Sequence, residues 1–104
     1  MLTFSNSKGT MKGMLASSKA GHDKDMIYVI IKEETEYVYL VDGKSRTIDK
    51  PKKKNKKHIQ IIKKYPGPDV SARIQAGHAD DIEIRKTIKQ YQVSRKQEVS
   101  NVKS

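Results

Sequence analysis

The sequence predicts a mainly β domain, a small antiparallel barrel or sandwich of about five short strands, followed by one C-terminal helix. Three observations lead to this fold class. Runs of β-branched and aromatic residues, each of strand length, alternate with turn residues as far as residue 64. Apolar residues take on a helical spacing only after residue 80. A chain of 104 residues, 35% of them apolar, is long enough for one domain with a modest core.

The strongest strands are predicted at residues 26–32 and 37–41, where β-branched residues and tyrosines dominate. A weaker strand at 13–18 precedes them, followed by a turn in which Gly21 can adopt a positive φ angle. Asp42-Gly43 predicts a type I′ hairpin turn, with 44–48 as the returning strand. The fifth strand is expected at 58–62, after a lysine-rich loop.

The remaining segments complete the predicted organisation, with a flexible lead-in at 1–12 and the β domain at 13–64. Residues 65–79, which begin with two prolines, are expected to form a linker. A helix is predicted at 80–92, because Asp80 and Glu83 form a capping-box pattern and Ile84, Ile88 and Tyr91 make one apolar stripe. The polar segment 93–104 has little to bury and is predicted to be a disordered tail.

Positive charge is concentrated in one part of the chain, whose formal net charge is +10. Residues 42–64 contain ten basic and two acidic residues, a net charge of +8, and six of the eight residues at 50–57 are lysines. Local positive charge on a small protein points to a polyanionic partner, because phosphate neutralisation releases counterions. A solvated basic loop is the alternative interpretation, since short basic runs are common.

Composition argues against catalysis and against cofactors. There is no cysteine for a nucleophile or a thiolate metal site, and the three histidines are too widely separated for metal-ligand spacing. The acidic residues near position 80 are explained by helix capping, so no metal site is expected. No apolar run approaches the ~20 residues that span a bilayer. We therefore expect a cytoplasmic protein that is not an enzyme and has neither a membrane nor a small-molecule substrate as partner.

Aromatic and arginine side chains could add specificity to a basic surface. Tyr28, Tyr37 and Tyr39 could stack on unpaired bases, but in a chain with one Phe and no Trp a role in the core is the favoured interpretation. Arg46 is the best candidate for shape-specific contact, because a guanidinium presents a planar fork whereas a lysine acts as a point charge.

Two blocks of sequence resemble a known family. Residues 13–24, Gly-Met-Leu-Ala-Ser-Ser-Lys-Ala-Gly-His-Asp-Lys, leading into Tyr28-Val29-Ile30, resemble the start of a KOW motif. The segments 42–46 and 51–58 strengthen the likeness. The order of these features is similar to that in small bacterial KOW-domain RNA-binding proteins related to the ribosomal protein L14e family. The resemblance covers roughly residues 13–62 and, more weakly, the helix.

The resemblance implies an SH3-like barrel that binds RNA in a ribosomal or translational setting, as a monomer off the ribosome. Gly21, Asp42 and Gly43 are then structural turn residues. The expected RNA-binding residues are the cations of the loop and of the basic segment: Lys19, His22, Lys24, Lys44, Arg46, Lys50, Lys52, Lys53, Lys54, Lys56, Lys57 and His58. Two alternatives remain open, namely a module that binds an acidic protein of the transcription or translation machinery, and a non-specific DNA binder.

Overall fold

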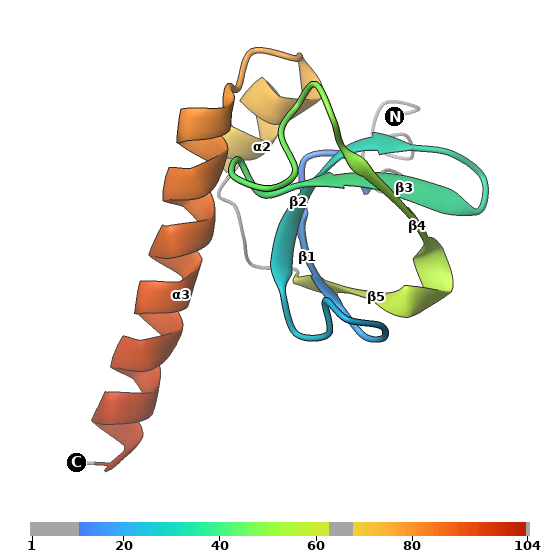
Figure 1. Ribbon diagram of the computed structural model, residues 1–104. Coiled ribbons are helices and arrows are strands. Elements are labelled where there is room, and N and C mark those ends of the chain that lie inside the picture. Colours follow the sequence, from blue (N-terminus) through green and yellow to red (C-terminus); the bar gives the residue numbers. More distant parts are fainter. Residues whose placement is uncertain (1–10, 63–67, 104) are drawn as a thin grey trace, which may run out of the picture.

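The computed structural model describes residues 11–62 and 68–103, which form one curved antiparallel sheet flanked by helices (Figure 1). The elements in chain order are β1 (Leu15–Ser18), β2 (Ile27–Glu33), β3 (Tyr37–Val41), β4 (Lys52–Asn55), the 3₁₀ turn η1 (Lys56–His58), β5 (Ile59–Ile62), α2 (Pro68–Gln75) and α3 (Asp81–Lys103). The predicted mainly β architecture with five strands and a C-terminal helix is confirmed at this level.

The strand order across the sheet is β4-β3-β2-β1-β5. Strands β4 and β5 are therefore the two edges, yet only the three residues of η1 separate them in sequence. So short a connection requires the sheet to curve until its edges approach each other, as Figure 1 shows. The ends of η1 are fixed locally, because the Asn55 side chain accepts a hydrogen bond from the Lys57 N–H at 3.0 Å.

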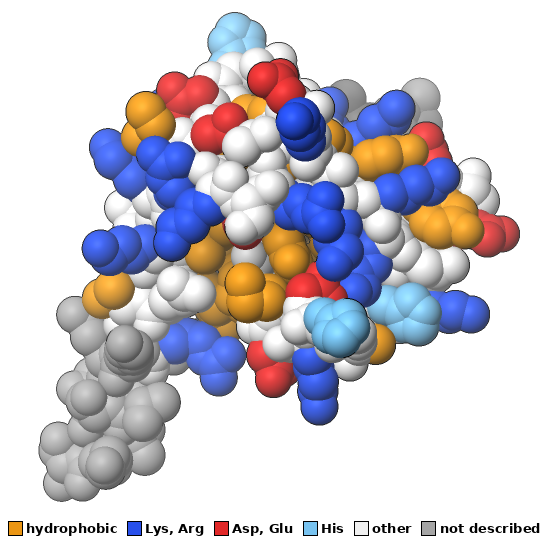
Figure 2. Space-filling model, viewed as in Figure 1, with side chains coloured by type: hydrophobic (Ala, Val, Ile, Leu, Met, Phe, Trp, Pro, Cys, Tyr) orange, Lys and Arg blue, Asp and Glu red, His pale blue; other side chains and the backbone are white. Residues whose placement is uncertain are grey.

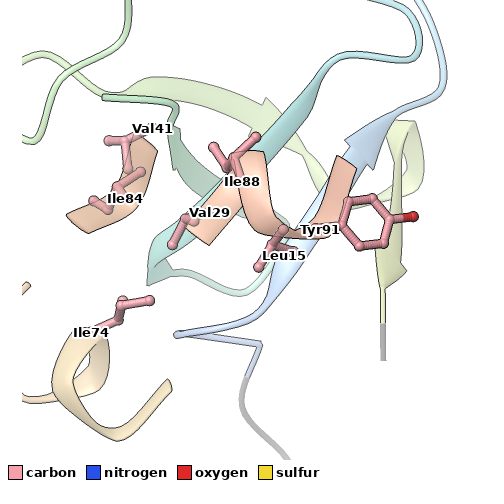
Figure 3. Close-up of a cluster of buried hydrophobic side chains, with 7 residues drawn as sticks. All are labelled: Leu15, Val29, Val41, Ile74, Ile84, Ile88 and Tyr91. Carbon is pink, nitrogen blue, oxygen red and sulfur yellow. The ribbon is translucent and has the colours of Figure 1, made fainter. Parts of the chain in front are cut away.

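Hydrophobic side chains pack on both faces of the sheet. On the inner, concave face they form one cluster, consisting of Ala16, Tyr28, Ile30, Val38, Leu40 and Ile59. On the outer face Leu15, Val29 and Val41 meet Ile74 of α2 and three residues of α3 (Figure 3). Strand β2 contributes to both clusters, which explains why its sequence is a continuous apolar run rather than an alternating one.

Helix α3 begins as the capping pattern predicts. The Asp80 carboxylate accepts a hydrogen bond from the Glu83 N–H at 2.9 Å, which satisfies one of the free donors of the first turn. The predicted apolar stripe of Ile84, Ile88 and Tyr91 is buried against the sheet, as Figure 3 shows.

Residues 44–48 are not a strand, so the predicted hairpin is wrong. Gly43 has a φ angle of +81°, but Asp42 is not among the described residues with positive φ, and a type I′ turn needs both. Instead, the Asp42 carboxylate accepts hydrogen bonds from the N–H groups of Lys44 and Arg46, at 2.8 and 2.9 Å. These donors are no longer available to a strand ladder, and the segment turns toward α3, where Asp81 accepts a hydrogen bond from the Ile48 N–H.

The fourth strand lies instead inside the lysine run that was predicted to be a loop. Residues 52–55 pair with β3, with Lys52 opposite Leu40 and Lys54 opposite Val38. Both lysines thus share the inner face with the buried cluster. Long aliphatic stems can cover apolar neighbours while the amines reach polar partners. A row of lysines is for this reason compatible with an edge strand.

Helical structure extends further than the sequence predicts. The segment expected to be a linker, 65–79, contains α2, and the segment expected to be a tail, 93–104, is helical through Lys103. Once a helix is nucleated on the core, it can propagate beyond the residues that pack on the sheet. The lead-in 1–10, residues 63–67 and residue 104 lie outside the described residues.

Replacing Gly43 with alanine is expected to destabilise the fold by about 2–4 kcal/mol, because strain at positive φ adds to overpacking. An added Cβ would clash with the Asp81 carbonyl oxygen and lie 2.6 Å from Cγ of Arg85. Gly77→Ala is the matched control, since Gly77 has a φ angle of +79° and no atom within 4 Å of the added Cβ. Urea unfolding should show the larger loss for Gly43→Ala. Equal losses would contradict close packing of the 42–46 turn on α3.

Candidate nucleic-acid interface

A single carboxylate, that of Asp23, organises the β1–β2 loop. It accepts hydrogen bonds from the amines of Lys52 and Lys54, both at 2.8 Å, and from the hydroxyls of Ser18 at 2.9 Å and Tyr28 at 3.2 Å. Only 11% of the Asp23 side chain is exposed. The Lys54 amine also donates to the Ala20 carbonyl at 3.0 Å. Two lysines of β4 therefore hold the β1–β2 loop on the inner face of the sheet, beside the inner cluster.

The network shifts the ionisation of its members. Burial alone would raise the pKa of Asp23, but hydrogen bonds from Lys52, Lys54 and Ser18 outweigh burial and hold that pKa well below its usual range. Burial, together with the negative charge of Asp23, raises the pKa of Tyr28 to about 12. At neutral pH the site therefore contains an ionised Asp23 carboxylate and a neutral Tyr28 phenol that donates its proton.

Half of the predicted lysine ridge is consequently used inside the protein. Lys52 and Lys54 pair with Asp23, and the Lys56 amine pairs with Glu33 at 2.7 Å. The other three lysines of the run, Lys50, Lys53 and Lys57, are exposed. Within β4 the division follows strand geometry, because successive side chains of a strand point to opposite faces, so Lys53 points away from the face of Lys52 and Lys54.

The tyrosines also divide into buried and surface side chains. Tyr28 is buried in the inner cluster, as favoured from the sequence. The expectation of a core role is wrong for Tyr37, whose side chain is on the other face of β3 and is 37% exposed. The Lys53 amine lies 4.5 Å from the centre of the Tyr37 ring, and the Lys32 amine lies 5.1 Å from that of Tyr39. These pairs are cation–π contacts on the sheet surface.

Two groups of predicted RNA-binding residues meet where the β1–β2 loop touches η1. The Lys19 N–H donates a hydrogen bond to the His58 carbonyl at 2.7 Å, joining segments that are 39 positions apart. Gly21 has a φ angle of +89°, the conformation expected for it, and lets the loop turn back. We call the exposed basic residues of these two segments the loop–turn surface: Lys19, His22, Lys24, Lys57 and His58.

The loop–turn surface is free to bind a partner. None of its side chains makes an ion pair or hydrogen bond with another described residue. Of the two acids in this loop, Asp23 is neutralised by two lysines and Asp25 is exposed. Figure 2 shows histidine and lysine side chains gathered over this part of the molecule. Its charge can therefore act outward, on solvent or on a ligand.

Lys44 and Arg46 lie elsewhere, in the 42–46 turn beside α3. Both side chains are exposed, although the N–H of each is bound by Asp42. The Arg85 guanidinium donates to the Gly43 carbonyl at 2.6 Å and ties this turn to the helix. The positive charge of Arg46 acts to lower the pKa of the Tyr28 hydroxyl, against the larger effects of burial and of Asp23.

Asp23 and Glu33 are the residues that sequence reasoning missed. Both lie outside the lysine run; Asp23 binds Lys52 and Lys54, and Glu33 binds Lys56, all more than 20 positions away. The spacing of Lys52 and Lys54 was a signal for a shared acidic partner, because residues two apart in a strand have their side chains on the same face. It could not be used while 50–57 was assigned to a loop.

No family model matches this chain, and no curated protein matches it. Among residues 11–62 and 68–103, no three His, Cys, Asp or Glu side chains are grouped as a metal site would require. No helix within the described part of the chain is both long enough and apolar enough to cross a membrane.

Asp23→Asn should reduce the free energy of unfolding by about 2–4 kcal/mol, because it leaves two partly buried lysines without a counter-charge. Asp25→Asn is the control. It removes the same charge from the same loop, at an exposed position of φ +72° that asparagine tolerates. Its effect should stay within about 0.5 kcal/mol. Equal stabilities for the two variants in urea unfolding would show that the Asp23 network does not hold the loop.

Stability should also depend on pH through Asp23. A pKa lowered in the folded state contributes stability above the unfolded value of about 3.9, and that contribution is lost as pH falls below it. The stability gap between the wild-type protein and Asp23→Asn should therefore be constant from about pH 7 to pH 5 and narrow from about pH 4 downward. Denaturant unfolding across this pH range measures the gap, and a gap that widens on acidification would contradict the assignment.

Proposed function

We propose that this chain is a KOW-type RNA-binding protein with an SH3-like barrel, acting on ribosomal RNA or on the ribosome in the cytoplasm. The observation that carries the proposal is the loop–turn surface. Exposed basic residues from two distant segments lie there, joined by the backbone hydrogen bond between Lys19 and His58, and Asp23 of the loop is neutralised internally. Such a surface can neutralise several phosphates without any reacting group.

The architecture supports the barrel and the family. Strands β4 and β5 lie at opposite edges of the sheet and are joined directly by η1. A small sheet that closes into a barrel needs its two edge strands to approach each other in this way. Gly21, the loop glycine of the KOW-like block, has a positive φ angle. Glycine adopts such an angle more readily than other residues, which is a physical reason for a fixed glycine at this position. Of the basic residues that resemble the family pattern, Lys19, His22 and Lys24 flank that glycine in sequence, and the Lys54 amine would lie 3.8 Å from a Cβ added to it.

The mechanism is electrostatic positioning rather than chemistry. The exposed lysines supply affinity with little choice of sequence, because each acts as a point charge. Lys52 and Lys54 contribute mainly by fixing the β1–β2 loop, since their amines bind Asp23, whereas the Lys56 amine binds Glu33 at the end of β2. Specificity would come from the shape of the RNA and from Arg46, whose fork fits phosphate or guanine.

RNA affinity should fall steeply with salt. If about four to six phosphates are neutralised, log K should decrease with log salt at a slope of about −3 to −5. Fluorescence anisotropy with a structured ribosomal RNA fragment, a duplex DNA and an acidic protein, each over a salt series, measures this and separates the alternatives. Tighter binding of the RNA at every salt concentration is expected. A salt-independent RNA affinity, or a preference for DNA or the acidic protein, would contradict the proposal.

The loop–turn surface should carry this salt dependence. The double variant Lys24→Gln/Lys57→Gln removes two exposed charges and should lower the magnitude of the slope by about 1.4–1.8. The control, Lys86→Gln/Lys89→Gln, removes two equally exposed charges from α3 and should leave the slope nearly unchanged. Equal changes in the two variants would mean that net charge, and not this surface, determines binding. Crosslinking in cells followed by RNA sequencing tests the ribosomal target, through enrichment of one ribosomal RNA region.

A further inference from the structure

A groove separate from the loop–turn surface runs between α3 and the start of β2. Its volume is about 680 Å³, within the range of about 300–1,000 Å³ typical of binding pockets. Met26, Ile27, Ile82 and Ile88 supply apolar lining, and Lys44, Lys86 and Lys89 supply cations. Figure 2 shows hydrophobic side chains at the bottom of this hollow, with Lys and Arg side chains on the α3 side.

The exposed apolar side chains of the groove are clustered rather than isolated. Met26 is 50% exposed and Ile82 is 55% exposed, and both line the same hollow. Single exposed apolar residues are normal on protein surfaces, whereas converging ones indicate an interaction site. Val93 extends the strip along α3, because Ile82, Lys86, Lys89 and Val93 follow one another at spacings of four, three and four. The helix thus has a second stripe, exposed and part apolar, beside its buried one.

Charge at the groove selects the partner. Lys44, Lys86 and Lys89 make no ion pair with any other described residue. Of the two acids that line the groove, Asp42 accepts two backbone N–H groups and Asp25 is exposed. Four cations line the groove against these two acids, so its net charge is positive. A second copy of this chain would bring the same cations to the contact and be repelled. An RNA base would need an aromatic ring or a free guanidinium to stack on. The groove lining has no aromatic residue, and its one arginine, Arg85, is bound to the Gly43 carbonyl.

We propose that this groove binds an amphipathic, acidic segment of another protein, whose aliphatic side chains contact Met26 and Ile82 and whose carboxylates pair with Lys86 and Lys89. A helix of about three turns laid along the α3 stripe would reach from Ile82 to Val93, since 11 residues rise about 16 Å. Helix-in-groove recognition uses this combination of apolar anchors and flanking charges. The site would let the protein contact a protein partner while the loop–turn surface remains available.

Selection from a display library of random 16-residue peptides, using the full chain as bait, tests the inference. The enriched peptides should combine Leu, Ile or Met at helical spacing with several Asp or Glu residues. Their anisotropy-measured affinity should fall about tenfold or more in Lys86→Glu/Lys89→Glu, because reversed charges repel the peptide carboxylates. Ile82→Gln should weaken binding by a factor of about five, through loss of an apolar contact at an exposed position.

A control variant separates this site from net charge. Lys53→Glu/Lys57→Glu reverses two exposed charges near β4 and η1 and should leave peptide affinity within about twofold. RNA binding by the loop–turn surface is measured independently, so its failure would not affect the peptide result.

Three outcomes would overturn the inference. One is enrichment of no peptide, or of peptides without acids or unaffected by Lys86→Glu/Lys89→Glu. Another is a dimer in analytical ultracentrifugation that Ile82→Gln dissociates, which would make a second copy the occupant. The third is a shift of the Met26 and Ile82 methyl resonances on adding an oligouridylate, which would assign the groove to RNA.

Discussion

The ion-pair network centred on Asp23 is the constraint on which the rest of this structure depends. Four side chains from β1, β2 and β4 donate to one carboxylate, so the β1–β2 loop is tied to all three of these strands. Partly buried charges are tolerated only when they are paired and hydrogen-bonded, and here each partner meets that condition. The lysine stems also cover apolar side chains that an edge strand would otherwise leave exposed.

The same network divides the positive charge into structural and available portions. A sequence with six lysines in eight residues invites the view that all of them face a ligand, yet three hold acids of the same chain. Their pairing positions the cations that remain free, because the loop bearing Lys19 and Lys24 is held where it meets η1. Affinity for a polyanion would thus rest on few charges in defined places rather than on the lysine run as a whole.

Helix α3 packs on the outer face of the sheet and also borders the groove. It buries one stripe on the outer face, anchors the 42–46 turn through Arg85 and Asp81, and leaves another stripe exposed beside the groove. The β1–β2 loop borders both surfaces, with the Lys19 N–H bound to His58 of η1 and Met26 in the groove. An RNA and a protein segment could therefore be bound next to each other without competing for the same side chains.

The sequence by itself determined the elements whose signals are local. Strands β2 and β3 follow from β-branched runs, the positive φ angle of Gly21 from its loop, and the start of α3 from Asp80 and its apolar stripe. Tertiary structure alone decided which lysines are free, that β4 forms from 52–55 and not from 44–48, and that Tyr37 lies on the surface. These outcomes depend on partners more than 20 positions away, Asp23 and Glu33 above all, and on the capture of backbone donors by Asp42. No local pattern encodes such long-range pairings, because the free energy of an ion pair depends on burial and geometry that only the folded chain provides.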